Sequence, residues 1–290
     1  MEGCKLFFYG KEDLMAKRKK KKQKVTVSQA IITILAAVLI IVTGGKFSGQ
    51  IPNLNLGFTE NVQETSDTSS QKLAASVLTD NVKKQLGSDS IQYNGAGAFI
   101  INNNKNNLNA NITSAPYAVN EVDQLGRAHI GNAWLNKSSR EYRDRNETGN
   151  GRTNWKPKGF HQLTNLPRDY QHAYDRGHLL AYALVGGIRG FNASESNAAN
   201  IATQTAWANE ARSKDSTGQN YYEGLVRKAL DQNKQVRYRV TNIYDGNNLV
   251  PSGAHLEAKS ADGTLQFNVF VPNVQSNIKI NYATGYATRN

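Results

Sequence analysis

Residues 174–180 read YDRGHLL and carry the most specific structural and chemical information in the chain. An apolar pair after a mixed polar run is typical of the start of a buried strand, and Gly177 allows close backbone approach there. His178 can take up a proton near neutral pH and so could activate a water, while Arg176 could grip a phosphate. The alternative is an ordinary strand entry with a solvated ion pair between Asp175 and Arg176.

Residues 197–211 read NAANIATQTAWANEA and are unusually rich in amides. We expect a helix here, although Asn and Gln are not strong helix formers. Carboxamide oxygens suit Mg²⁺, which keeps several waters and needs few protein ligands. At about 100° per residue, Asn200 and Asn209 fall on opposite sides of a helix, so both reach one metal only if Asn200 precedes the helix. A capping and turn segment is the alternative.

The rest of the chain after residue 89 reads as a mixed α and β domain. Strands are expected at residues 98–101, 128–135, 235–244 and 264–271. A second helix is expected over residues 219–232, where Tyr222, Val226 and Leu230 share one side. A short helix within residues 71–85 could begin the domain.

The N-terminal part predicts a membrane anchor. Residues 17–22 read KRKKKK, and residues 25–45 carry no charge over a length of roughly 30 Å as a helix. Basic residues before such a span hold the N-terminus inside. We therefore expect a cytoplasmic basic N-terminus (1–24), a transmembrane signal-anchor (25–45), a flexible linker (46–88) and an extracellular domain (89–290). A cleavable signal peptide, which releases the domain from the cell membrane, is the alternative.

The charge balance favours a polyanionic partner. The 290 residues include 35 basic and 23 acidic side chains, and only nine of the basic ones lie in residues 1–45. The single cysteine, Cys4, excludes a disulfide framework and a thiolate metal cluster in the body of the chain.

Residues 137–158 hold seven basic side chains against three acidic ones. Arg143, Arg145 and Lys156 are the candidates for substrate binding in this stretch, since phosphate contacts give affinity without sequence information. The interleaved Tyr142 and Trp155 could stack on bases. The alternative is an ordinary solvated loop.

The run DRGH (175–178), followed at fixed spacing by Asn200, Gln204 and Asn209, resembles the DNA/RNA non-specific endonuclease family. The segments TGNGRTNW (148–155), QTAWAN (204–209) and STGQNYYE (216–223) are similar to the DNA-entry nucleases of streptococci, which act in competence. The resemblance extends over roughly residues 89–290. It implies an α+β fold, with a central antiparallel sheet flanked by helices and a ββα-metal active-site motif.

The resemblance also implies roles for the residues of the motif. His178 matches the general base, and Asn209, 31 residues later, matches the single direct protein ligand of Mg²⁺. Arg176 matches the arginine that neutralises the phosphate, and Asp175 the acid that orients its neighbours. We expect a backbone carbonyl to hold the second ring nitrogen of His178.

The remaining matches are less specific. Asn200 and Gln204 match supporting amides, which we assign to substrate binding. Glu223 matches a glutamate near the water shell of the metal, a place that Glu210 could take instead. His172, six residues before His178, could help to bind substrate or shape the site, and a structural role is the alternative.

Together these matches predict an Mg²⁺-dependent endonuclease, with Mn²⁺ able to substitute. It is expected to hydrolyse DNA, and RNA as well, without sequence preference and to leave 5′-phosphate ends. Its expected setting is DNA uptake during competence, beside the uptake machinery, or degradation of extracellular DNA. The alternatives are a non-catalytic surface receptor for DNA and a phosphodiesterase acting on small substrates.

Overall fold

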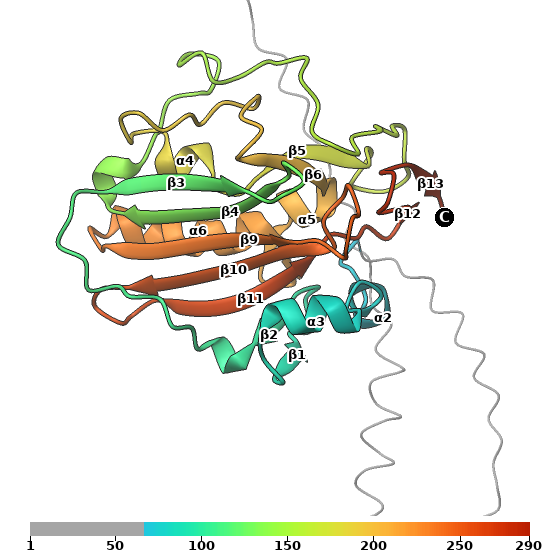
Figure 1. Ribbon diagram of the computed structural model, residues 1–290, viewed down its shortest axis with the longest axis horizontal. Helices are drawn as coiled ribbons and strands as arrows, with labels where there is room; N and C mark the ends of the chain where they lie inside the picture. Colours follow the sequence, from blue (N-terminus) through green and yellow to red (C-terminus); the bar gives the residue numbers. More distant parts are fainter. Residues whose placement is uncertain (1–66) are drawn as a thin grey trace, which may run out of the picture. The chain divides into compact units, whose positions relative to one another are not determined.

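A seven-stranded antiparallel sheet forms the frame of the protein (Figure 1). The computed structural model describes residues 67–290, and its strands run in the order β1-β2-β11-β10-β9-β4-β3. The strands are β1 (Ile91–Tyr93), β2 (Phe99–Ile101), β3 (Tyr117–Val122), β4 (Ala128–Leu135), β9 (Val236–Ile243), β10 (Gly253–Ser260) and β11 (Gln266–Pro272). The expected α+β class with a central antiparallel sheet is confirmed.

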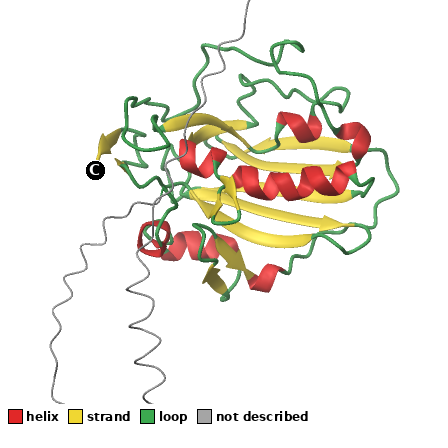
Figure 2. Ribbon diagram, turned by 180° about the vertical axis from the view of Figure 1, so that it is seen from behind, coloured by secondary structure: helices red, strands yellow, loops and turns green. Residues whose placement is uncertain are grey.

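Helix α6 (Gln219–Asp231) runs along one face of this sheet (Figure 2). Its Val226 and Leu230 are fully buried, and they share one hydrophobic core with Tyr238 and Val240 of β9. The alternating residues of β9, such as Arg239, are only partly buried, as expected when one face of a strand meets the core. Each large apolar side chain buried in this layer contributes about 1.5–3 kcal/mol, so the sheet and α6 provide a rigid base.

A two-stranded ribbon and a helix form a second, smaller unit. Strand β5 (Tyr174–His178) pairs antiparallel with β6 (Ile201–Thr205), and Asp175 lies opposite Gln204. Helix α5 (Ala206–Glu210) follows β6 directly, because Oγ1 of Thr205 accepts a hydrogen bond from the backbone N–H of Ala208 and caps the helix. The β5-β6-α5 unit is the ββα motif, and it carries the residues of the DRGH run together with Asn209.

The helix expected over residues 197–211 is wrong for most of its length. Residues 201–205 are extended and all five are buried, and only α5 is helical. Ile201, Thr203 and Thr205 are β-branched, and pairing with β5 outweighs a weak helical spacing. Asn200 therefore precedes the helix, so the helical spacing of about 100° per residue does not place it on the side opposite Asn209.

Two helices begin the described part of the chain. α2 (Gln71–Ala75) and α3 (Asp80–Leu86) place Ala74, Val82 and Leu86 in the main hydrophobic core. Ser70 and Thr79 cap them with their hydroxyl oxygens. The linker boundary expected at residue 88 is therefore wrong, because the folded domain already includes these helices.

The expected cytoplasmic segment (1–24), signal-anchor (25–45) and first part of the linker lie outside the described residues. Between residues 67 and 290, none of the helices has the length and apolar content to cross a membrane.

The remaining elements are short. They are η1 (Asn102–Asn104), η2 (Lys137–Ser139), α4 (Tyr182–Val185), β7 (Arg212–Ser213), β8 (Ser216–Thr217), β12 (Ile278–Ile280) and β13 (Ala287–Arg289). The four expected strands and the helix at 219–232 are confirmed as β2, β4, β9, β11 and α6. Strand β10 was not expected from the sequence.

Candidate active site

Gly177 lets a glutamine side chain cross the ββα ribbon. A Cβ at this position would lie 2.3 Å from Oε1 and 2.4 Å from Cβ of Gln204, which is far inside van der Waals contact. The glycine of the DRGH run is thus required by close approach, as the sequence predicted, and Gln204 is free to reach helix α6.

His178 is paired with a buried glutamate of α6. Nε2 of His178 lies 2.8 Å from Oε1 of Glu223, whose side chain is 3% exposed. Burial raises the pKa of Glu223, but the charge of His178 and hydrogen bonds from His178 and Gln219 outweigh it, so the pKa is lowered. Glu223 is therefore ionised at neutral pH. The backbone carbonyl expected to hold His178 is replaced by this carboxylate.

Gln219 connects the two parts of the site. Its Nε2 donates to the backbone carbonyl of His178 at 2.6 Å and to Oε1 of Glu223 at 3.0 Å. Its Oε1 accepts from Nε2 of Gln204 at 3.1 Å. A hydrogen-bond chain therefore runs from β6 through α6 to the imidazole. The sequence reasoning missed Gln219, although its position one helical turn before Glu223 was a usable signal.

Asn209 presents an unsatisfied oxygen at the end of α5. Its Nδ2 donates to Oδ2 of Asp175 at 2.9 Å, which fixes the orientation of the amide. Its Oδ1 has less than 1 Å² of exposed surface and no hydrogen-bond partner within residues 67–290. A buried carbonyl oxygen without a partner is costly unless something fills the position, and a hard cation suits it. As a ligand atom, Oδ1 of Asn209 therefore fits a divalent metal.

Asp175 is the centre of the acidic side of the site. Its Oδ1 lies 2.7 Å from Nε2 of His172, and Glu210 Oε1 lies 3.7 Å from the same nitrogen. Of the two glutamates that the sequence left open, Glu210 is therefore the one beside Asp175 and Asn209. Glu223 instead contacts His178.

The chain is similar in sequence and fold to known proteins. The family model of the DNA/RNA non-specific endonucleases matches residues 95–287, which is well over half of the chain. The chain belongs to this family. It is also similar to NucA from Streptococcus agalactiae with magnesium ion bound, at 46% identity over 77% of this chain and 99% of that one, with a TM-score of 0.71. The same nuclease with no metal bound matches at 46% identity, 77% and 98% coverage and a TM-score of 0.68.

Two of the substrate-binding residues expected for this endonuclease are instead part of its interior. Asn200 is 1% exposed, accepts from the backbone N–H of Leu180 and donates to the carbonyl of Leu180. Gln204 is 7% exposed and bonded to Gln219. Their observed hydrogen bonds hold the ribbon together, and their assignment to substrate binding stays a prediction.

Arg176 of the endonuclease holds the basic loop in place. Its Nε donates to the carbonyl of Trp155 at 2.8 Å and its Nη2 to that of Thr153 at 3.0 Å. The guanidinium also lies over the ring of Phe160. Its role as a phosphate ligand stays a prediction, whereas its contacts with the loop are observed.

The three other basic candidates differ in exposure and in the partners of their side chains. Arg143 is mostly exposed but paired with Glu141. Arg145 donates to the carbonyl of Ala193, and burial lowers its pKa, although nearby acidic groups including Glu223 act against this. Lys156 is exposed at the edge of a pocket of about 260 Å³ that Trp155 also lines. Of these contacts, the charge of Glu223 acting on Arg145 is the one that involves the His178–Glu223 pair.

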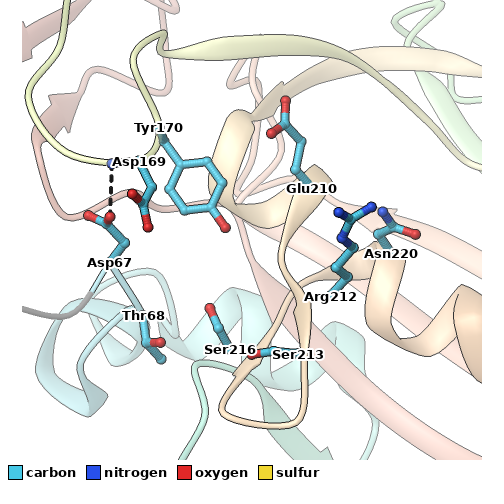
Figure 3. A pocket seen from close by; sticks show the side chains of 9 residues that line it. All are labelled: Asp67, Thr68, Asp169, Tyr170, Glu210, Arg212, Ser213, Ser216 and Asn220. Carbon is cyan, nitrogen blue, oxygen red and sulfur yellow. Dashed lines mark hydrogen bonds between the residues drawn. The ribbon is translucent and has the colours of Figure 1, made fainter. Parts of the chain in front are cut away.

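An open cavity of about 730 Å³ lies next to the acidic side of the endonuclease site (Figure 3). Its lining includes Glu210, Tyr170, Arg212 and Asn220. Figure 3 shows Glu210 and Asp169 on different sides of this cavity. Solvent therefore reaches Glu210 from this cavity.

Proposed function

We propose that this endonuclease hydrolyses phosphodiester bonds of DNA and RNA, without sequence preference, by water that His178 activates. The proposal rests on one observation above the others. A single ββα unit carries an imidazole fixed by an ionised glutamate and an asparagine oxygen that has no partner within residues 67–290. These are the two groups needed to activate a nucleophile and to hold a cation.

The tautomer of His178 follows from its partner. An ionised carboxylate can only accept a hydrogen bond, so Nε2 of His178 carries the proton that Glu223 accepts. Nδ1 then holds the lone pair and can take a proton from water. The carboxylate also stabilises the imidazolium that results, in the way that a buried acid supports the histidine of a catalytic triad.

Asn209 would hold the metal, which we propose to be Mg²⁺, with Mn²⁺ able to substitute. When bound, such an ion neutralises charge on the phosphate as the bond to the leaving oxygen breaks. Asp175 keeps the amide of Asn209 in position through its 2.9 Å hydrogen bond. By family resemblance, the products carry 5′-phosphate ends.

The basic stretch at residues 137–158 supports binding through the phosphate backbone. Arg176 anchors this loop to β5, so the loop and the ribbon form one substrate surface. Arg145 and Lys156 would contact phosphates, and the half-buried Trp155 would stack on a base.

We further propose that the domain is held outside the cell by residues 25–45. The charge block at residues 17–22 and the uncharged length that follows support this single-pass topology. The setting would then be uptake of DNA during competence, beside the uptake machinery, or degradation of extracellular DNA.

A plasmid and RNA cleavage assay tests the proposed activity. The full chain in detergent should cleave both substrates with Mg²⁺, lose all activity in EDTA and regain it with added Mg²⁺ or Mn²⁺. Undiminished cleavage in EDTA contradicts the metal step. Binding of plasmid without cleavage under any metal condition would support a DNA receptor instead.

A further inference from the structure

His172 lies outside the imidazole and amide that the proposed mechanism uses. It stands just before β5, where an isolated β-bridge to Thr164 fixes its backbone. Its Nε2 faces two carboxylates, Asp175 Oδ1 at 2.7 Å and Glu210 Oε1 at 3.7 Å. One ligand atom from each of the three residues lies within 4.8 Å of the others.

The geometry of this cluster suits a metal ion with mixed nitrogen and oxygen ligands. Ligand atoms about 2.0–2.2 Å from a tetrahedral zinc ion are roughly 3–4 Å apart, so small side-chain movements bring these atoms onto one centre. Solvent can reach the cluster, because the side chains of His172, Asp175 and Glu210 are 34%, 21% and 49% exposed.

A second observation points to a cation at the same place. The amide of Asn209 is fixed to Asp175 through Nδ2, while its Oδ1 is buried without a partner in the described part of the chain. The amide that carries the unsatisfied oxygen is thus hydrogen-bonded, through its nitrogen, to the carboxylate that faces His172. A metal bound by the cluster would add a positive charge close to this amide.

We propose that His172, Asp175 and Glu210 form a site for a first-row transition ion such as Zn²⁺. Imidazole nitrogen and carboxylate oxygen are both ligand types that zinc takes, whereas Mg²⁺ takes oxygen ligands and keeps most of its waters. The fourth position is open to water.

Occupation of this site has a consequence for the proposed reaction. Asp175 holds Asn209 in place, and a zinc ion would move the Asp175 carboxylate away from Nε2 of His172, from 2.7 Å to the roughly 3–4 Å that separates two zinc ligand atoms. Asn209 would then be held differently, so Zn²⁺ should inhibit cleavage supported by Mg²⁺. This consequence rests on the proposed function, but zinc binding itself does not.

Zinc affinity is therefore measured without nucleic acid and without Mg²⁺. The full chain in detergent, carrying Cys4→Ser to remove the thiol, competes with a chromogenic indicator for Zn²⁺. We expect one ion per chain, and at least tenfold weaker binding for His172→Gln and Glu210→Gln. His178→Gln and His161→Gln are the matched controls, and both should stay within twofold.

A replacement that restores a zinc ligand separates ligation from folding. His172→Cys should keep zinc affinity within tenfold of the parent. Zinc-edge X-ray absorption of this variant should show that imidazole scattering is replaced by a sulfur ligand at about 2.3 Å, the typical length of a Zn–S bond. The proposal is overturned if the parent chain binds no zinc, or if His172→Gln binds it as tightly as the parent. Either result leaves the plasmid assay, and with it the proposed function, untouched.

Discussion

Nε2 of His178 lies 2.8 Å from Oε1 of Glu223, so the proposed general base on β5 is held by a carboxylate on α6 that is 3% exposed. The two residues are 45 positions apart in the sequence and come from different layers of the fold. The orientation of the base therefore depends on how α6 packs against the sheet as well as on the ββα unit.

Glu223→Gln should lower kcat strongly while changing KM little. The amide oxygen of Gln carries no charge, so it cannot stabilise the imidazolium as the carboxylate does. We therefore expect kcat to fall by about 10²- to 10⁴-fold. Steady-state cleavage of a short labelled duplex measures both constants. A kcat within threefold of the parent would show that Glu223 does not position His178.

Acid should remove a stabilising contribution that Glu223 makes. The folded-state pKa of Glu223 is lowered from 4.5, so the unfolded chain binds the extra proton first as the pH falls. This contribution is present above about pH 4.5 and is lost as the pH falls through the folded-state pKa. Urea unfolding from pH 7 to 3.5 should show a steeper loss for the parent than for Glu223→Gln; parallel curves would contradict this.

Asn209→Ala should raise the Mg²⁺ concentration needed for half-maximal cleavage by at least tenfold. The variant lacks the unpartnered buried amide oxygen that the ββα unit offers to a cation. Its fold should be retained, because Asn209 lies at the end of α5 and is only partly buried. A metal titration checks this, and an unchanged midpoint would remove Asn209 from the metal site.

Gly177→Ala should destabilise the fold by about 1–3 kcal/mol, because the new Cβ overlaps with Gln204. Gly224→Ala is the matched control, since its Cβ would meet only Nη2 of Arg227 at 3.6 Å. Alanine also favours a helix interior by about 1 kcal/mol, so this variant should be neutral or more stable. Denaturant unfolding of both variants provides the comparison, and equal stabilities would contradict the close approach.

Lys156→Ala should weaken DNA binding uniformly across sequences and reduce the slope of log affinity against log salt by about one. Lys156 is exposed, so its removal should leave stability unchanged. Binding of unrelated duplexes to a His178→Ala background, at several salt concentrations, measures the slope without cleavage. An unchanged slope would remove Lys156 from the phosphate-binding surface.

Much of the main sheet could be predicted from the sequence, because β9 and β11 show strong local patterns. Their apolar and β-branched enrichment lies between turn signals, and helix α6 has a regular apolar side. Strand β6 could not be predicted in this way. Its five residues are all buried, so the alternation that marks a strand is absent, and pairing with β5 decides its structure.

Some of the site residues could likewise be predicted from the sequence, and others could not. His178 and Asn209 stand out because their spacing resembles a family motif, and Gly177 because glycine permits close approach. The partner of His178 could not be predicted, since it depends on the packing of α6. The burial of Asn200 and Gln204 depends on hydrogen bonds to Leu180 and Gln219, which no local pattern encodes.

The rate of a single turnover on plasmid DNA, with enzyme in excess over DNA and saturating Mg²⁺, tests the central claim most directly. His178→Ala should bind DNA with the affinity of the parent chain and cleave it at least 10³-fold more slowly, because no other group takes the proton from water. A His178→Ala variant that cleaves within tenfold of the parent rate would contradict the assignment of His178 as the general base.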